Sequence, residues 1–418
     1  MIENKKVPKI RFKGFTEDWE QCKLKNVVKY RRGSFPQPYG KDEWYGGYGA
    51  MPFIQVADVG DDLKLVSETK QTISKIAQPM SVFIPKESVI VTLQGTIGRV
   101  AITQYDAYLD RTVLFFDTYL KKNINKYFWA ITIKNKFESE RKKAPGAIVK
   151  TITKEALSDF DISITKLSEQ LKIGNYFKYL DNLITLHQCK CEKLVNVKKS
   201  VLEKMFPKNP SNMPEIRFKG FTEDWEQRRF DEMADYKKGP FGSVLKKDIF
   251  VPKSKDTVKV YEQQNAINKN WRLERYFITR DYANQLKSFE THAGDIIISC
   301  AGTIGEIYEL PDNSETGIIN QALMRVRVNE KIVSKDLYRI IFSNMIDDFS
   351  RERSNGSAIK NIPPFSDLKP TLALIPNTNE QNKISSFINN LDNLITLHQR
   401  KLEKLNNIKK SMLDKMFV

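Results

Sequence analysis

Short motifs with the composition of a phosphate-binding turn occur twice in this sequence. Gly95-Thr-Ile-Gly98 and Gly302-Thr-Ile-Gly305 each follow an apolar stretch, which places Thr96 and Thr303 in turns at strand ends. Backbone N–H groups and hydroxyls in such turns can approach a phosphate closely. A hairpin turn that uses glycine because φ is positive explains the same motif without any ligand. Both interpretations stay open at this point.

Basic and amide side chains near these turns are further candidates. Arg31-Arg32 and Lys237-Lys238 each precede a glycine in matching contexts, which suits the rim of a nucleic-acid interface. Gln55 and Gln263 occupy matching positions after short apolar stretches. A Gln side chain can form two hydrogen bonds with adenine in the major groove, although a Gln at a strand end is equally ordinary.

Two loop segments complete the candidate site. Lys150 and Lys360 follow glycines at equal spacing, and we predict that they contact phosphate rather than only solvent. The segments Leu109–Thr112 and Ile319–Ala322 correspond, but Arg111 stands in one and Gln321 in the other, so their reading chemistry differs. The predicted contact residues are Arg31, Arg32, Gln55, Thr96, Arg99, Arg111, Lys150, Lys237, Lys238, Gln263, Thr303, Gln321 and Lys360.

The matching positions reflect a duplication of the whole chain. Fourteen residues from Pro8 return from Pro214 with one difference, and Leu180–Gln188 returns unchanged as Leu391–Gln399. The offsets between copies stay between 206 and 211 residues. A period this long excludes a solenoid and predicts two domains of one kind.

The segments that match best have a helical pattern. Glu169–Phe206 and Glu380–Phe417 are identical at 25 of 38 positions, and their apolar residues recur at steps of three and four. Each would form a rod of roughly 57 Å with one apolar stripe, which needs a partner. We expect the two helices to pair antiparallel and to relate the halves by a pseudo-two-fold axis. His187, His398, Lys198 and Lys409 would lie in the seam, where they either set the register or extend to solvent.

The parts between these helices share only scattered motifs. Ser88–Leu93 and Asp295–Ser299 resemble buried strands, whereas Tyr127–Phe137 and Lys335–Phe349 resemble helices. The fold class is therefore mixed α/β (α+β). A common frame that presents two different specificities explains the uneven divergence better than neutral drift does.

Charge and composition point to a polyanionic partner. Lys and Arg number 68 against 51 Asp and Glu, which gives a net charge of +17 and a field that attracts DNA. No apolar stretch is long enough to span a bilayer, and the first residues lack a secretory pattern. The four cysteines fit neither a disulfide framework nor a zinc site. We expect a cytoplasmic protein without metal or cofactor and without a membrane partner.

Known catalytic motifs are missing from the sequence. It contains no phosphate-binding Gly-x-x-x-x-Gly-Lys-Ser/Thr loop, no His-Glu-x-x-His and no deaminase signature. Asn361-Ile-Pro-Pro-Phe365 is similar to the Asn-Pro-Pro-Phe of adenine methyltransferases, but the inserted Ile breaks that turn. No glycine-rich loop for a methyl donor precedes it. We therefore expect a binding protein and not an enzyme.

Over essentially its full length, the chain resembles the specificity subunit of type I restriction–modification systems. The resemblance depends on the order and duplication of five features, none of which is diagnostic alone. They are the Glu-Gln-x-Lys-Ile start of each long helix, Leu-Asp-Asn-Leu-Ile-Thr-Leu-His-Gln, the Gly-Thr-Ile-Gly turns, the Gly-x-x-x-Lys-x-Ile loops, and Lys-Gly-Pro-Phe-Gly-Ser at 238–243.

The resemblance implies two target-recognition domains that each read one half of a split double-stranded DNA site. Paired helices would act as a ruler for the unread spacer. Such subunits have no activity alone; they recruit two modification subunits, which methylate adenine, and then restriction subunits that translocate and cut DNA. The expected parts are a first recognition domain (1–166), a central helix (167–207), a second recognition domain (208–378) and a C-terminal helix (379–418).

Two other classes of protein are possible on the residues alone. A stand-alone, pseudo-dimeric DNA-binding regulator would need no methyltransferase partner, and a pull-down would distinguish it. A scaffold that binds only protein explains neither the basic balance nor the two divergent domains.

Overall fold

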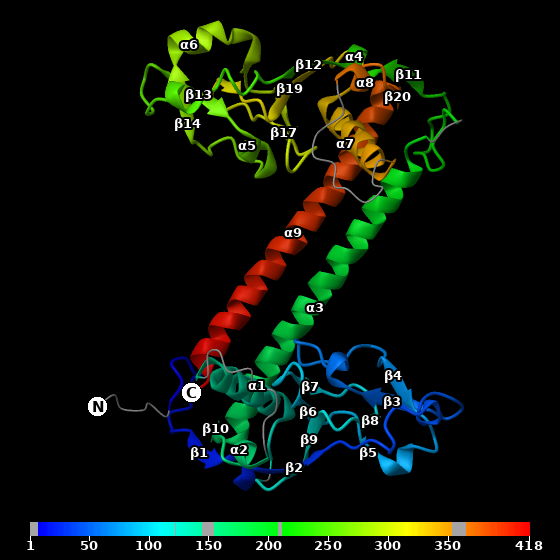
Figure 1. Ribbon diagram of the computed structural model, residues 1–418, viewed down its shortest axis with the longest axis vertical. Helices are drawn as coiled ribbons and strands as arrows, with labels where there is room; N and C mark the ends of the chain where they lie inside the picture. Colours follow the sequence, from blue (N-terminus) through cyan, green and yellow to red (C-terminus); the bar gives the residue numbers. More distant parts are fainter. Residues whose placement is uncertain (1–6, 122, 144–153, 208–210, 353–364) are drawn as a thin grey trace. The chain divides into compact units, whose positions relative to one another are not determined.

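The chain forms two compact units, which the computed structural model describes over residues 7–121, 123–143, 154–207, 211–352 and 365–418 (Figure 1). One unit contains Met1–Lys190 and His398–Val418, and the other contains Cys191–Leu397. Two long helices, α3 (Leu167–Lys204) and α9 (Thr378–Met416), each begin in one unit and end in the other.

The first unit contains three sheets. Its strands are β1 (Glu20–Lys23), β2 (Val28–Arg32), β3 (Met51–Ile54), β4 (Gln71–Ile73), β5 (Val82–Ile84), β6 (Val89–Thr92), β7 (Val100–Ile102), β8 (Ala107–Leu109), β9 (Val113–Tyr119) and β10 (Asp161–Ile164). The strand orders are β2-β9-β6-β7, β4-β3-β8-β5 and β1-β10. Among these strands only β3 and β8 pair in parallel. Helices α1 (Lys126–Lys143) and α2 (Lys154–Ser158) precede β10.

The second unit repeats this topology strand for strand. Its strands are β11 (Glu226–Arg229), β12 (Ala234–Lys238), β13 (Thr257–Tyr261), β14 (Tyr276–Thr279), β15 (Glu290–Thr291), β16 (Ile296–Ser299), β17 (Ile307–Glu309), β18 (Gly317–Ile319), β19 (Leu323–Val328) and β20 (Leu372–Ile375). Their orders are β12-β19-β16-β17, β14-β13-β18-β15 and β11-β20. Helix α7 (Lys335–Glu352) corresponds to α1, while α4 (Phe230–Met233), α5 (Gln263–Ile267), α6 (Arg280–Gln285) and α8 (Phe365–Leu368) are short. The expected duplicated mixed α/β architecture is confirmed.

The apolar strand β6 is covered on both faces. Val89 and Val91 pack in a cluster with residues of α1, whereas Ile90 packs with Ile54 and Leu109 of the second sheet. Because side chains alternate along a strand, two covered faces require an unbroken apolar sequence. Strand β16 is buried in the same way, and both expected strands are therefore correct.

A buried ion pair attaches the start of each long helix to its own unit. Arg11 donates two hydrogen bonds to Glu169, at 2.8 and 2.7 Å, and Arg217 donates two to Glu380, both at 2.7 Å. Both carboxylates are fully buried. Although burial favours the neutral acid, the hydrogen bonds from Arg11 and Thr165 hold the pKa of Glu169 below its usual value.

The glutamine after each of these carboxylates connects the helix to the adjacent loops. Gln170 donates to the Thr165 carbonyl at 2.7 Å and accepts from the backbone N–H of Asn125 at 3.0 Å. Gln381 donates to the Pro376 carbonyl at 3.0 Å and accepts from the backbone N–H of Ser334 at 2.8 Å. The shared Glu-Gln sequence thus has a structural role, since it fixes where each helix leaves its unit.

Cross-helix polar pairs hold α3 and α9 antiparallel within each unit. In the first unit Lys409 lies 2.5 Å from Asp181, and in the second Lys198 lies 2.6 Å from Asp392. These are the same pair in the two copies, because 181 and 198 correspond to 392 and 409 in the repeat. The lysines between the two helices are therefore ion-paired and specify one register of α3 against α9.

Among the described helices, none combines the length and apolarity that crossing a membrane demands.

Equivalent histidines from the two copies meet in the same seam. The Nδ1 atoms of His187 and His398 are 2.8 Å apart, so one ring must donate a proton and the other must accept it. Partial burial, together with His398, Lys401 and Lys190, holds the pKa of His187 below its usual value. Protonation of both rings would place two donors against each other.

We expect stability to fall as the pH is lowered below about 6.5, the ordinary histidine pKa. In that range the unfolded chain binds a proton that folded His187 excludes, so protonation favours unfolding. Because the rings are partly exposed, the loss should stay below about 1 kcal/mol. Thermal unfolding between pH 7.5 and 5.5 at constant ionic strength would measure it. His187→Gln should flatten this pH dependence, and an unchanged slope in the variant would contradict the assignment.

Candidate nucleic-acid interface

In the first unit, the end of β2 lies directly against the loop after β8. The N–H of Gly33 donates to the carbonyl of Val113 at 2.9 Å, and the N–H of Ser34 donates to that of Leu109 at 3.1 Å. A Cβ atom at Gly33 would lie 2.3 Å from the carbonyl oxygen of Asp110. Only glycine permits this approach, which explains the glycine after the basic pair.

The same loop also contacts the ends of β3 and β6. Its Asp110 N–H donates to the Ile54 carbonyl at 3.0 Å, and Thr112 accepts from the Leu93 N–H at 2.8 Å. Three strand ends and one loop therefore converge. Residues from four of the predicted motifs lie in or after these strand ends and this loop, and we call them the first strand-end cluster: Arg32, Gln55, Thr96 and Arg111.

The second unit builds the same junction from different residues. A Cβ atom at Gly239 would lie 1.8 Å from the Asn320 carbonyl oxygen. The N–H of Asn320 donates to Tyr261 at 3.0 Å, and that of Cys300 donates to Ala322 at 2.8 Å. The predicted contact residues that lie in or after these segments are called the second strand-end cluster: Lys238, Gln263, Thr303 and Gln321.

Both Gly-Thr-Ile-Gly motifs form tight hairpins within these junctions. The Thr92 hydroxyl accepts from the Arg99 N–H at 3.0 Å and donates to the Thr96 carbonyl, and Ser299 makes the same two bonds in the second unit. The first and last glycines have φ of 63° and 82° in one motif and 66° and 79° in the other. Hairpin geometry thus accounts for the glycines, while the side chains of Thr96 and Thr303 remain exposed.

The predicted equivalence of the two glutamines is wrong by one residue. Ile54 and Tyr261 hold the same register against β8 and β18, so Gln55 corresponds to Glu262. Both residues cap a helical turn through the side chain three positions later. Gln263 is the first residue of α5, and its Oε1 atom is buried without a hydrogen-bond partner among the described residues.

Only one member of each basic pair belongs to a cluster. Arg31 lies 3.0 Å from Asp117, and the Lys237 ammonium lies 4.9 Å from the ring centre of Phe289. Since successive side chains on a strand point to opposite faces, the following residue is directed the other way. In the first unit that residue is Arg32, whose Nε donates to the Arg111 carbonyl.

The remaining predicted contacts are Arg99, Lys150 and Lys360. Arg99 lies 3.0 Å from Asp61, so its charge is paired. Lys150, Lys360 and the 361–364 segment lie outside the described residues.

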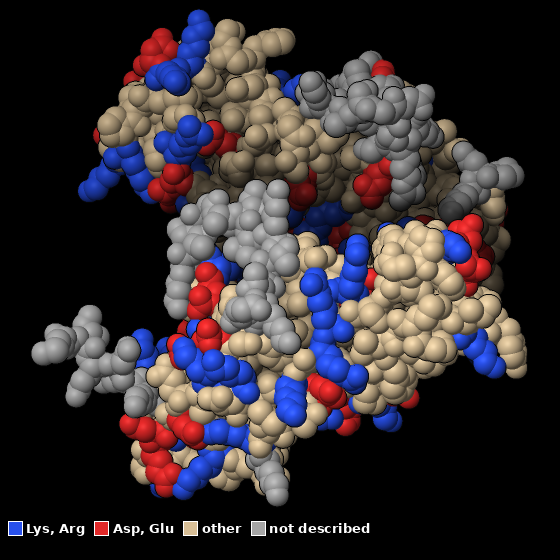
Figure 2. Space-filling model, turned by 60° about the horizontal axis from the view of Figure 1, so that its bottom comes forward, with Lys and Arg blue, Asp and Glu red and all other residues tan. Residues whose placement is uncertain are grey.

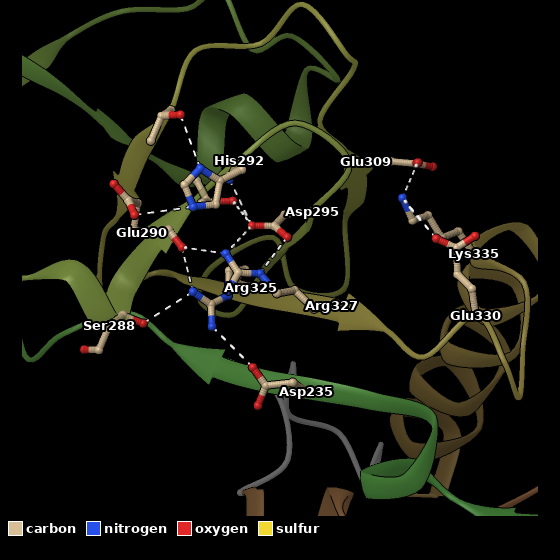
Figure 3. A network of polar contacts seen from close by, with 12 residues as sticks. Asp235, Ser288, Glu290, His292, Asp295, Glu309, Arg325, Arg327, Glu330 and Lys335 are labelled. Carbon is tan, nitrogen blue, oxygen red and sulfur yellow. Dashed lines mark hydrogen bonds and ion pairs between the residues drawn. The ribbon is translucent and has the colours of Figure 1, made fainter.

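A polar network distinguishes the interior of the second unit from that of the first (Figure 3). Arg325 of β19 occupies the position that Phe115 has in β9. It donates to a carbonyl of β15 at 2.6 Å and lies 3.3 Å from Asp235, while Arg327 lies 2.8 Å from Asp295. Burial lowers the pKa of Arg325. The two units therefore have the same backbone topology but differ in the interior side chains that stabilise it.

The positive side chains do not form a single patch on the face of the molecule drawn in Figure 2. On the face that Figure 2 shows, Lys and Arg side chains gather in several groups with Asp and Glu groups between them. The excess of 17 positive charges therefore acts mainly as a general attraction for a polyanion.

The family model for the type I restriction modification DNA specificity domain matches the chain twice, over residues 16–196 and 222–407. The chain belongs to this family. It is a type I restriction–modification DNA specificity subunit and is itself non-catalytic, as the sequence predicted.

Individual relatives agree with the family match. The specificity subunit of the type I restriction enzyme MjaVIII from Methanocaldococcus jannaschii is 22% identical over 413 residues, covering 95% of this chain and 92% of the relative. The crystal structure of the type I restriction–modification S subunit from M. genitalium superimposes with a TM-score of 0.63 at 14% identity, covering 99% of both chains. A structure described as the basis of complex assembly and conformational transition of the type I R-M system gives 0.53 at 14% identity, with 96% and 97% covered. These likenesses support the fold.

The two strand-end clusters share one backbone arrangement. Each contains exposed hydrogen-bond donors beside a point where a strand end and a loop lie in backbone contact. Several of the side chains differ between the two units. The sequence did not indicate the Arg11–Glu169 and Arg217–Glu380 pairs. Their signal was nevertheless present, because both copies have the same arginine and the same glutamate at matching positions.

Proposed function

We propose that this subunit reads a bipartite double-stranded DNA site, with each strand-end cluster contacting one half. The proposal depends on one observation: the same backbone junction occurs in both units, but different side chains project from it. Arg32 and Arg111 stand where the other unit has Lys238 and Gln321. Sequence recognition needs contacts that position the protein on the DNA backbone and side chains that distinguish the bases. A shared junction with different side chains can supply both.

We further propose that the chain recruits two modification subunits and, through them, restriction subunits, in the cytoplasm. The long helices are identical at 25 of 38 positions, so they would offer two similar copies of one protein-binding surface. The related structure concerned with assembly of the type I R-M system supports a multisubunit complex. Double-stranded DNA would be the third partner.

Methylome sequencing of cells with and without this gene tests the proposal. We expect an adenine-methylated motif with two specified halves and an unread spacer that disappears when the gene is deleted. The purified chain with methyl donor alone should methylate nothing. Recovery of the native chain without any methyltransferase, together with an unchanged methylome, would instead favour a stand-alone DNA-binding regulator.

Lys150→Ala and Lys360→Ala should weaken DNA binding by the assembled complex without changing the preferred sequence. Phosphate contacts supply charge but little sequence information. The slope of log K against log salt should therefore become shallower by about 1 for each phosphate that the variant no longer neutralises. The control variants Lys150→Arg and Lys360→Arg retain the charge and should bind like the parent. An altered methylation motif in either alanine variant would show that these lysines read bases.

A further inference from the structure

We propose that an aromatic residue beside the 109–112 or 319–322 loop sets the base that each unit reads. In the first unit Tyr39 positions Arg111 to read a G·C pair. In the second, Gln321 reads an A·T pair and Phe241 contacts its thymine methyl group. This inference rests on the proposed function.

Hydrogen bonds fix the backbone at Arg111, and its guanidinium group lies over an aromatic ring. The carbonyl of Arg111 accepts from Arg32, and the Asp110 carboxylate accepts from the Thr112 N–H at 2.9 Å, which closes the turn around it. The guanidinium carbon lies 5.3 Å from the ring centre of Tyr39. A stacked guanidinium keeps its N–H groups directed outward in its plane.

The donors of Arg111 are available to a ligand. Its side chain is exposed, and no ion pair involves it among the described residues. Tyr39 is itself 54% exposed and packs on Phe35 with ring centres 4.8 Å apart, so the stacking platform is supported from below. An arginine with a free planar fork bonds O6 and N7 of guanine in the major groove, and prior positioning reduces the entropic cost of binding.

Gln321 occupies the same turn in the second unit. The Asn320 side chain accepts from the Ala322 N–H at 3.0 Å, as Asp110 does with Thr112. Gln321 is exposed, and its amide can bond N6 and N7 of adenine. A neighbouring loop carries the aromatic residue of this unit, Phe241.

The side chain of Phe241 in that neighbouring loop is exposed to solvent. It is 86% exposed, although its carbonyl accepts from the Val244 N–H at 2.9 Å and thereby fixes the turn. A Cβ atom at Gly242 would lie 3.9 Å from Nε2 of Gln321, which places this loop against the glutamine. Single exposed apolar residues are common, but this one adjoins a candidate base-reading side chain. A phenyl ring there suits the thymine C5-methyl group.

The first unit shows that the exposure of Phe241 is not imposed by the fold. Phe35 stands two residues after Gly33, as Phe241 stands two residues after Gly239. Phe35 is only 7% exposed, because Tyr39 and other rings cover it. In the first unit the phenylalanine is buried and packs against Tyr39, which contacts Arg111. In the second unit the corresponding phenylalanine is exposed to solvent.

The experiment uses the complete complex with its modification subunits and sequences the methylome of each variant. Arg111→Gln should lower methylation of the parent motif about 5- to 100-fold and replace or relax one G·C position in one half-site. Arg111→Lys retains the charge but loses the fork, and should relax the same position. Tyr39→Ala should relax it partly, while Tyr39→Phe should restore the parent pattern because the ring is kept.

Phe241 is tested on oligonucleotides in which uracil replaces each thymine of the other half-site in turn. One replacement should slow methylation by the parent complex and not by Phe241→Ala, because only the methyl group differs. Equal loss at every site with an unchanged motif in Arg111→Gln, or no uracil effect in the parent, would overturn the inference. Failure of the proposed function has a different signature, namely a parent complex that methylates no bipartite motif.

Discussion

Replacement of Glu380 with alanine is expected to destabilise the second unit by about 3 to 5 kcal/mol. The change leaves the Arg217 guanidinium with a side chain only 10% exposed and without its carboxylate, so a buried charge loses its partner. The first unit should be unaffected, because its own pair is Arg11 with Glu169. Hydrogen exchange resolved by peptide would show reduced protection in β11, β20 and α7 and unchanged protection in β1, β10 and α1.

A matched control separates burial from charge. Glu215 lies 2.7 Å from Lys204 in the same unit, but that pair is exposed, with side chains 66% and 42% accessible. Glu215→Ala should destabilise the unit far less than Glu380→Ala does, because solvent screens an exposed pair. Glu169→Ala should transfer the large loss to the first unit. A small effect of Glu380→Ala, comparable to that of Glu215→Ala, would show that the buried pair does not stabilise the helix attachment.

Lengthening both long helices by four residues should lengthen the unread DNA spacer by one or two base pairs. The insertions belong between Lys190 and Cys191 and between Leu397 and His398, where the chain divides into its two units. All cross-helix pairs within each unit then keep their register. Four residues add about 6 Å, close to two base-pair steps of 3.4 Å. They also rotate the helix by roughly 40° beyond a full turn, so some affinity should be lost.

Methylome sequencing of the double insertion against the parent gives the result directly. Both half-sites should keep their sequences while the spacer grows. An insertion in α3 alone breaks the register with α9, since Lys198 can no longer face Asp392, and should abolish most methylation. An unchanged spacer with full activity would mean that the helices only connect the units. An altered half-site would mean that base reading extends onto the helices.

The duplication, the mixed α/β class, the two long helices and the class of function could all be predicted from the order of the residues. Each depends on signals that are local or repeated. Helical periodicity is set by neighbours three and four residues apart, and an apolar run such as Ser88–Leu93 predicts a covered strand wherever the layers lie. The turn motifs were found because they occur twice.

Which polar side chains meet could be learned only from the folded chain. Arg31 and Lys237 were predicted with their neighbours, but alternation along the strand turns them toward other partners. The glutamine equivalence failed because a shift of one residue is invisible until β3 and β13 pair with their parallel neighbours. Arg11 and Glu169 are 158 residues apart, and no local pattern could have joined them. Contacts of this kind follow from strand register and from the packing of distant segments, which a one-dimensional sequence does not contain.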